Sequence, residues 1–322
     1  MPIRPGPCYF VRPALRNNRP AVPSTSAIPP DALPRVADAL AALAGAGLPA
    51  LEARMLVSHV TGLSRVQLIT QDTCSIDDGA RARLAELATR RLTGEPMAYL
   101  LGEREFFGRM FQVTPAVLIP RPDTELLVEQ ALDRIDDRDA PDVLDLGTGS
   151  GIIAVTIALA RRDACVWATD TSTDALAVAV RNAQSLGAAN VHVALGDWYA
   201  ALPENDAPPV FDLIASNPPY IASTDTHLDQ GDLRFEPAGA LTDHGNGLRH
   251  LCTIVAGAPA RLAADGWLLL EHGYDQGPAV RALLAEAGFA DVFTAQDLAG
   301  HDRCSGGRRP AAQDAACRTS LE

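Results

Sequence analysis

The chain has 322 residues, a formal net charge of -13 at pH 7, and a composition that is 47% hydrophobic and 21% charged, which is ordinary for a globular protein. No apolar run approaches the roughly 20 residues that cross a bilayer, so we expect no membrane association. The acidic balance and the lack of a basic stripe argue against stable nucleic-acid binding, because such proteins gain much of their affinity by neutralising phosphates.

The N-terminal segment, residues 1–30, differs from the rest of the chain. It holds eight prolines and four arginines but no acidic residue. Because proline fixes φ and removes a backbone donor, these prolines exclude the amphipathic helix of a transit peptide. We expect a disordered, proline-rich extension. A start codon assigned too far upstream is the second interpretation.

A small helical domain is predicted over residues 31–104. Residues 34–43 and 53–60 have helical patterns, with glycine and proline between them. A third helix is indicated by apolar residues that recur on one helical face, at Leu84, Leu87, Ala88 and Leu92. We interpret the domain as a module for substrate recognition. A helical cap with only a structural role is the alternative.

The segment after this domain predicts a linker and then a helix. Residues 105–119 alternate in polarity around Gly108, which favours a β-hairpin between two domains. The following helix is expected to begin after Pro122, with Asp123 or Thr124 as its N-terminal cap.

From residue 142 onward, short apolar runs alternate with helical patterns. The expected strands are 143–146, 165–169, 191–195, 211–215, 266–271 and 292–295, and the expected helices are 152–160, 174–186, 251–262 and 278–287. Apolar strands separated by helices indicate an α/β fold with a mainly parallel sheet that is covered on both faces. A last strand at 303–308 is weakened by two adjacent glycines, and residues 310–322 are expected to form a loose tail.

A glycine-rich turn follows the first of these strands. Its sequence is Asp145-Leu146-Gly147-Thr148-Gly149-Ser150-Gly151. Such turns open doubly wound folds and let a ligand approach the backbone. The spacing differs from the G-x-G-x-x-G of dinucleotide sites, and it suits S-adenosylmethionine better, because that ligand has no phosphate to place on the helix N-terminus. A turn with only a structural role is the alternative.

Acidic and aromatic residues end the next two strands. Asp170 ends the second strand, where a carboxylate can accept both hydroxyls of a ribose. Asp197 and Trp198 end the third strand, and together they can offer an acceptor and an apolar wall to an adenine. Because ligands of open α/β sheets bind at the carboxyl ends of the strands, these residues are expected to line one site.

The segment Asn217-Pro218-Pro219-Tyr220 ends the fourth strand. The side-chain oxygen of Asn217 and the backbone carbonyl of Pro218 can bind the two hydrogens of a carboxamide and aim its nitrogen at a methyl donor. The prolines stiffen the loop, and Tyr220 can stack on the planar group. No strong base is needed before the methyl transfer, and none is evident near this segment. A proline turn that merely closes a strand is the alternative.

These motifs resemble those of the PrmC (HemK) family of protein-glutamine N5-methyltransferases, which modify class I peptide-chain release factors. The resemblance covers about residues 50–308 and rests on the segments 119–125 (IPRPDTE), 145–151 (DLGTGSG), 216–221 (SNPPYI), 234–237 (RFEP) and 270–273 (LEHG). Asn-Pro-Pro-Tyr alone is shared with adenine-N6 methyltransferases. The segment Arg121-Pro122-Asp123-Thr124-Glu125 is more specific, because ribosomal-protein glutamine methyltransferases differ there.

The resemblance implies a class I S-adenosylmethionine-dependent methyltransferase fold, Rossmann-like with seven strands, in a catalytic domain over residues 120–309. It implies that S-adenosylmethionine is the cofactor, bound by Gly147, Thr148, Gly149, Ser150, Gly151, Asp170, Trp198 and Asn217. It also implies that Asn217, Pro218, Pro219 and Tyr220 hold the glutamine of a Gly-Gly-Gln loop, while the helical domain contacts the release factor.

Four further residues have two interpretations each. Phe106 and Phe107 either wall the cofactor pocket or belong to the core. Arg234 and Glu236 either order the loop after Tyr220 or form a surface ion pair, which would contribute little energy.

The predicted activity is transfer of a methyl group from S-adenosylmethionine to the side-chain N5 of a release-factor glutamine. Methylation of a ribosomal-protein glutamine is the nearest alternative. Adenine-N6 methylation needs a flipped base and a basic approach surface, so the acidic balance disfavours it. A scaffold that binds the cofactor without catalysis would not need the acceptors of the Asn217 segment.

Cysteine and arginine usage predict the compartment. The six cysteines are scattered without a CxxC pair, so we expect neither a metal site nor a disulfide framework. Reduced thiols are typical of a cytosol. The chain has no lysine, which we interpret as the codon bias of a GC-rich bacterial genome. We therefore expect a monomeric, cytoplasmic bacterial protein.

Overall fold

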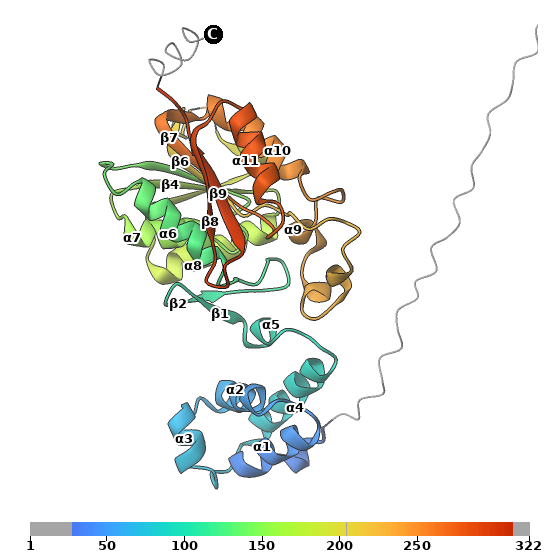
Figure 1. The fold of residues 1–322 in the computed structure, drawn as a ribbon. Coiled ribbons are helices and arrows are strands. Elements are labelled where there is room, and N and C mark those ends of the chain that lie inside the picture. Colours follow the sequence, from blue (N-terminus) through green and yellow to red (C-terminus); the bar gives the residue numbers. More distant parts are fainter. Residues whose placement is uncertain (1–27, 204, 312–322) are drawn as a thin grey trace, which may run out of the picture.

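The structure is a computed structural model that describes residues 28–203 and 205–311 (Figure 1). Most of the expected N-terminal extension and C-terminal tail therefore lies outside the described residues. Ile28 belongs to the predicted extension, yet its side chain is buried in the helical core. No helix among the described residues is both long and apolar enough to cross a membrane.

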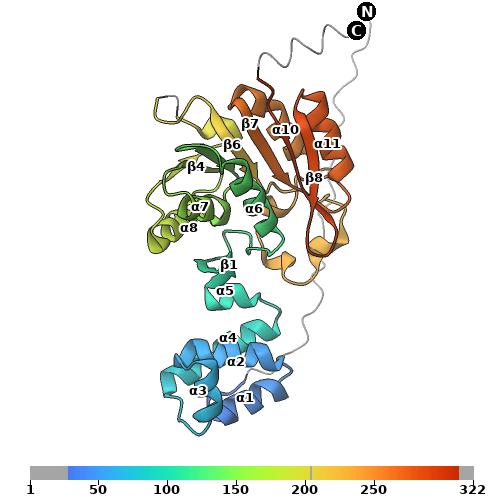
Figure 2. The same ribbon diagram turned by 60° about the vertical axis from the view of Figure 1, so that its left-hand side comes forward.

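Helices form the N-terminal part, which lies at one end of the molecule in both ribbon views (Figures 1 and 2). They are η1 (Pro30–Ala32), α1 (Val36–Gly45), α2 (Ala50–Thr61), α3 (Arg65–Thr70), α4 (Asp78–Leu92) and α5 (Met97–Leu101). Fully buried leucines give this part its own core, among them Leu33, Leu43, Leu56, Leu84 and Leu87. The sequence patterns missed α3 and α5 because both are too short to show a periodicity. A capping box between Ser64 and Gln67 defines the start of α3.

A β-hairpin follows the helices, as predicted, but it is shorter than the predicted segment 105–119 and begins earlier. Its strands are β1 (Glu103–Phe106) and β2 (Arg109–Gln112), and they pair antiparallel. Phe107 and Gly108 form the turn, with φ of 51° and 74°. Positive φ at both central residues is typical of tight hairpin turns, because their twist matches that of the strands.

The C-terminal part contains a seven-stranded sheet with the order β5-β4-β3-β6-β7-β9-β8. The strands are β3 (Asp142–Leu146), β4 (Cys165–Asp170), β5 (Val191–Leu195), β6 (Phe211–Ser216), β7 (Leu262–Glu271), β8 (Ala290–Gln296) and β9 (Asp302–Arg308). Strands β3 to β7 run parallel to one another, and β9 runs antiparallel to both β7 and β8. The mainly parallel α/β sheet predicted from the sequence is confirmed. The order changes direction at β3 and β6, where ligands of open sheets bind.

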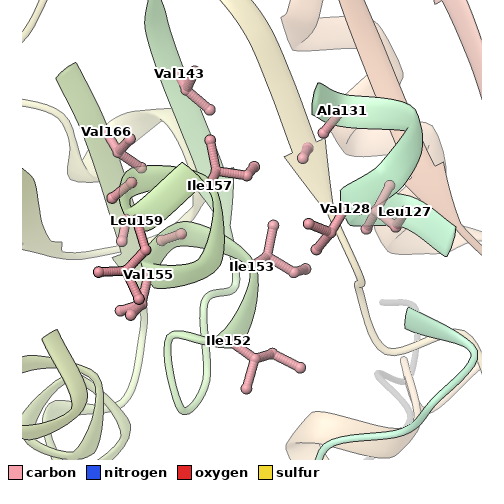
Figure 3. Packing of buried hydrophobic residues seen from close by; sticks show 14 of the residues in the cluster. Leu127, Val128, Ala131, Val143, Ile152, Ile153, Val155, Ile157, Leu159 and Val166 are labelled. Atoms are coloured by element: carbon pink, nitrogen blue, oxygen red, sulfur yellow. The ribbon is translucent and has the colours of Figure 1, made fainter. Parts of the chain in front are cut away.

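Helices cover both faces of this sheet, because alternate strand residues point to opposite sides. These helices are α6 (Thr124–Arg134), α7 (Ile152–Ala160), α8 (Thr173–Leu186), α10 (Arg249–Gly257) and α11 (Gly277–Glu286), while the short α9 (Ala238–Leu241) belongs to the segment between β6 and α10. Val143 and Val166 face α7, whose Ile153 also meets Val128 of α6 (Figure 3). Leu144 and Ile214 face the opposite side, toward α10 and α11. The helix predicted over 251–262 ends too late: α10 ends at Gly257, a 3-10 helix, η5 (Ala258–Ala260), follows, and Leu262 already begins β7.

The last strand, β9, lies inside the sheet despite its glycine pair. A Cβ atom on Gly306 would lie 2.5 Å from Cδ2 of Leu269 and 2.8 Å from the backbone oxygen of Leu268. One on Gly307 would lie 2.8 Å from Cβ of Phe289. Close packing therefore requires both glycines here, and this outweighs their low strand propensity.

Candidate active site

The predicted site residues lie together at the carboxyl ends of β3, β4, β5 and β6. A cavity of about 270 Å³ is lined by Gly147, Thr148, Gly149, Ser150, Asp170, Asp197, Trp198, Asn217 and Pro219. A smaller cavity of about 60 Å³ is lined by Asn217, Pro218 and Tyr220. Asn217 lines both, as do Leu118, Arg121 and Ala240, so these residues mark where the two cavities meet. Of the residues predicted for the site, only Gly151 lines neither cavity.

The conformation of the glycine-rich turn depends on its three glycines. Gly147, Gly149 and Gly151 have φ of 71°, 56° and 84°, a region that favours glycine. A Cβ atom on Gly147 would lie 3.3 Å from the Trp198 ring, so a larger residue would narrow the cavity. Gly151 instead precedes α7 and packs closely against Ala179 of α8.

Asp145 stabilises the glycine-rich turn through hydrogen bonds. Its side chain is fully buried, and its Oδ2 accepts hydrogen bonds from the Thr148 hydroxyl at 2.6 Å and from the Ala154 N–H at 3.2 Å. Burial raises the pKa of Asp145 to about 7, which these two hydrogen bonds oppose. Asp145 therefore positions the turn and lies behind the cavity wall.

Asp170 joins the turn to the end of β4. Its Oδ2 accepts from the Gly149 N–H and its Oδ1 from the Ser172 N–H, both at 2.9 Å. Each carboxylate oxygen has a second lone pair, so the group can still accept from a ligand in the cavity that it lines.

Trp198 forms one wall with a histidine that the sequence analysis did not consider. Its backbone has φ of 43°, and its ring lies 5.3 Å from the His250 ring at an angle of 56°. Both residues line the larger cavity. Burial is the main reason that the pKa of His250 lies below its usual value, so the ring is neutral at pH 7.

The Asn217 amide is oriented by α6. Its Nδ2 donates a hydrogen bond to Oγ1 of Thr124 at 3.2 Å, and Thr124 is buried. The Oδ1 atom accepts no hydrogen bond from the described residues, and neither does the Pro218 carbonyl. Both predicted acceptors are therefore available. Asp123 occupies the N-cap position of α6, as predicted, but its side chain makes no capping hydrogen bond, and its carboxylate lies 3.5 Å from Arg303.

Glu236 joins the segment 234–237 to the segment 119–125 through its contacts with Arg121 and Ile119. Its buried carboxylate forms an ion pair with Arg121 and accepts from the Ile119 N–H at 2.9 Å. Arg234 makes a different contact, since its guanidinium donates to the Thr93 carbonyl at 3.0 Å. The interpretation of Arg234 and Glu236 as a surface ion pair with each other is wrong, because each binds another segment.

Glu271 lies in the smaller cavity, although no role followed for it from the sequence. It ends β7, is 1% exposed, and its Oε1 accepts from the Tyr220 hydroxyl at 3.4 Å. The available signal was an acid at the end of the apolar run 268–270, the pattern that also identified Asp170.

Comparison with known proteins identifies the family. A family model described as the PrmC N-terminal domain matches residues 33–102, and one described as the methyltransferase small domain matches residues 122–249. The release factor glutamine methyltransferase of Bordetella pertussis is 58% identical over 265 residues, which cover 82% of this chain and 97% of that protein. That of Burkholderia pseudomallei is 55% identical over 282 residues, which cover 86% and 98%. The chain belongs to the release factor glutamine methyltransferase family.

The fold of this release factor glutamine methyltransferase family member is shared with proteins of known structure whose sequences differ widely from it. The solved structure of the hMettl16 catalytic domain in complex with MAT2A 3'UTR hairpin 1 aligns with a TM-score of 0.52 at 14% identity, covering 85% of this chain and 92% of that one. At this identity the likeness shows the fold alone. With the methyltransferase family match and the strand order, it confirms the predicted class I methyltransferase fold.

In this member of the release factor glutamine methyltransferase family, Phe106 and Phe107, which precede the sheet, have structural roles. Phe106 is 1% exposed and packs edge-on against Phe111, with ring centroids 6.1 Å apart. Phe107 donates its backbone N–H to Glu125 at 2.9 Å. Neither lines a described cavity, so the core interpretation of Phe106 and Phe107 holds.

Proposed function

We propose that this protein transfers the methyl group of S-adenosylmethionine to N5 of the glutamine in the Gly-Gly-Gln motif of class I peptide-chain release factors. The orientation of Asn217 carries the proposal. Thr124 occupies the amide nitrogen, which leaves the oxygen of Asn217 available where the two cavities meet. That oxygen and the Pro218 carbonyl are suited to the two hydrogens of a carboxamide.

The larger cavity fits the cofactor by its chemistry. Asp170 and Asp197 give the lining a negative character, and Arg121, which also lines it, is neutralised by Glu236. This suits a sulfonium cation and disfavours the pyrophosphate of a dinucleotide. In our proposal Asp170 accepts the ribose hydroxyls, Asp197 and Trp198 bind adenine, and residues 147–150 approach the ligand with their backbone.

The chemistry supplied by S-adenosylmethionine is an electrophilic methyl group on sulfur. The protein's part is to hold the glutamine nitrogen in line with it. An amide lone pair is delocalised, so acceptors on both N–H groups favour the charge that develops on nitrogen during transfer. The rigid Pro218-Pro219 segment keeps these acceptors at a fixed spacing. In this proposal the helical N-terminal domain contacts the release factor.

The decisive experiment is mass spectrometry of a release factor after incubation with the protein and S-adenosylmethionine. We expect one added methyl group on the Gly-Gly-Gln peptide. With radiolabelled cofactor, release factor should be labelled while duplex DNA and ribosomal protein are not. Label only on DNA or on a ribosomal protein would refute the proposed substrate.

Asp170→Ala is expected to weaken S-adenosylmethionine binding by roughly 10- to 100-fold, the effect of losing hydrogen bonds to a charged group. Isothermal titration calorimetry measures it. Asp174→Ala is the matched control, because Asp174 lies exposed in the first turn of the following helix and lines neither cavity. Equal affinity in the two variants would contradict the role given to Asp170.

A further inference from the structure

Glu271 is a carboxyl group in the cavity that is suited to the substrate amide. It follows the apolar residues Leu268, Leu269 and Leu270 at the carboxyl end of β7, beside β6, which leads into Asn217. Its side chain lines the smaller cavity together with Asn217 and Pro218. Its Oε2 atom is buried and makes no hydrogen bond of normal geometry with any described residue, although the Thr124 hydroxyl lies close enough to lower the pKa of the carboxyl. A buried carboxylate oxygen without a partner is costly, which points to a ligand as the missing partner.

The groups around Glu271 come from several elements. Tyr220 donates to Oε1 from the loop after β6, and Cys304 lies opposite on β9. Arg303 of β9 and Asp123 and Thr124 at the start of α6 act on the carboxyl. Arg121, which is ion-paired with Glu236, lines the same cavity. Burial raises the pKa of Glu271 to about 7, with Asp123 in the same direction and Thr124, Arg303 and Tyr220 opposing. Burial also raises the pKa of Tyr220, so the phenol stays protonated as a donor. Glu271 can therefore gain and lose a proton near neutral pH.

Methylation of an amide nitrogen leaves a proton to be removed. When the nitrogen lone pair forms the new N–C bond, the S–C bond breaks with its electron pair on sulfur, and the nitrogen carries a methyl group, two hydrogens and a positive charge. One hydrogen must leave as a proton to give the neutral product. The Asn217 and Pro218 oxygens are amide carbonyls, which accept hydrogen bonds but are very weak bases.

Other nearby carboxyl groups are less suited to take this proton. Glu236 is engaged by Arg121 and the Ile119 N–H, and Asp145 lies behind the glycine-rich turn. Asp170 and Asp197 line only the larger cavity. Oδ1 of Asp145 also lacks a partner, but Asp145 lines neither cavity. Of these carboxyl groups only Glu271 lines the smaller cavity, and its Oε2 is the unpartnered oxygen there.

We propose that the Glu271 carboxylate accepts the proton that the glutamine nitrogen loses as the methyl group is transferred, and later releases it to solvent. The proposal rests on the proposed function. The charges balance: the sulfonium becomes a neutral thioether, the amide gains a methyl group and loses one hydrogen, and the carboxylate becomes a neutral acid. A general base of this kind contributes roughly 10²- to 10⁴-fold to a rate.

Glu271→Gln tests this, because the amide keeps the shape and the acceptor for Tyr220 but cannot take a proton. With intact release factor and saturating S-adenosylmethionine, we expect kcat to fall by roughly 10²-fold. The Kd for S-adenosylmethionine, measured by calorimetry, should change little. In the natural protein kcat should rise with pH to a plateau above an apparent pKa of about 7. This rise should be absent in Glu271→Gln.

Tyr220→Phe tests whether Glu271 acts by accepting a proton or only by supporting the structure of the site. It removes the hydroxyl that contacts Glu271, so kcat should fall, but the rise of kcat with pH should remain. A Glu271→Gln variant that keeps this rise, or whose kcat lies within about threefold of the natural value, would overturn the proposal. Should that variant not fold, a natural protein whose kcat is constant from about pH 5.5 to 8.5 would overturn it equally. Failure of the natural protein to methylate the release factor would instead refute the proposed function.

Discussion

Asn217→Ala should lower the rate of methyl transfer by roughly 10²- to 10³-fold, the usual cost of removing one preorganised hydrogen-bond partner in a transition state. The substitution removes the oxygen that is suited to the substrate amide and the group that Thr124 orients. The Kd for S-adenosylmethionine should rise less than about tenfold, because the glycine-rich turn, Asp170 and Trp198 all remain. Single-turnover kinetics on release factor, with calorimetry for the cofactor, measure both quantities.

Thr124→Val tests the orientation of Asn217, although the Thr124 hydroxyl also acts on Glu271. Valine has the shape of threonine without the hydroxyl, so the Asn217 side chain stays present but loses its one described hydrogen bond. We expect an intermediate loss of about tenfold in the transfer rate. If Asn217→Ala transferred methyl groups at the natural rate, Asn217 would have no part in the mechanism.

Gly306→Ala should lower the free energy of unfolding by about 2 to 3 kcal/mol, the range for overpacking in a dense core. The new methyl group would meet the Leu268 backbone oxygen at 2.8 Å and Cε1 of Phe293 at 2.9 Å, besides the Leu269 side chain. Because the backbone oxygen belongs to the paired strand β7, it cannot move without disturbing the sheet. Urea denaturation followed by circular dichroism measures the change.

Gly45→Ala provides the comparison, since it makes the same chemical change in an open place. Gly45 ends α1, and a Cβ atom there has no neighbour within 4 Å. We expect this variant to be as stable as the natural protein or more stable by up to about 1 kcal/mol, because alanine favours helices. Equal losses in both variants would show that close packing is not the reason for glycine in β9.

The fold could be predicted where local pattern and tertiary packing agree. The run 152–160 became α7 without change, and Gly187 ends α8 in the left-handed conformation expected of a C-cap. Local pattern and tertiary packing disagree at residues 262–264. Leu262, Ala263 and Ala264 favour a helix by composition, but Leu262 pairs with Phe211 of β6 and starts a strand. Such pairing between distant residues overrides local propensity and is not visible in a short window.

In the candidate site too, the residues at strand ends could be predicted from the sequence, whereas the residues that support them through long-range contacts could not. Asp170, Trp198 and Asn217 were predictable because each lies at or just after the end of a strand, and one sheet edge collects the strand ends. Their supports were not predictable from pattern. Thr124 meets Asn217 across 93 positions of sequence, and Glu236 meets Ile119 across 117. Only the folded chain brings these pairs together.

The place of β9 between β7 and β8 has a consequence for synthesis on the ribosome. Of the described strands β9 is the last to be made, yet β8 has no other partner in the sheet and β7 has only β6 besides it. Until residues 302–308 emerge from the exit tunnel, both strands expose unpaired backbone that can associate with other chains. Nascent or truncated chains that stop before residue 302 should therefore be prone to aggregation, however well their N-terminal helices have folded.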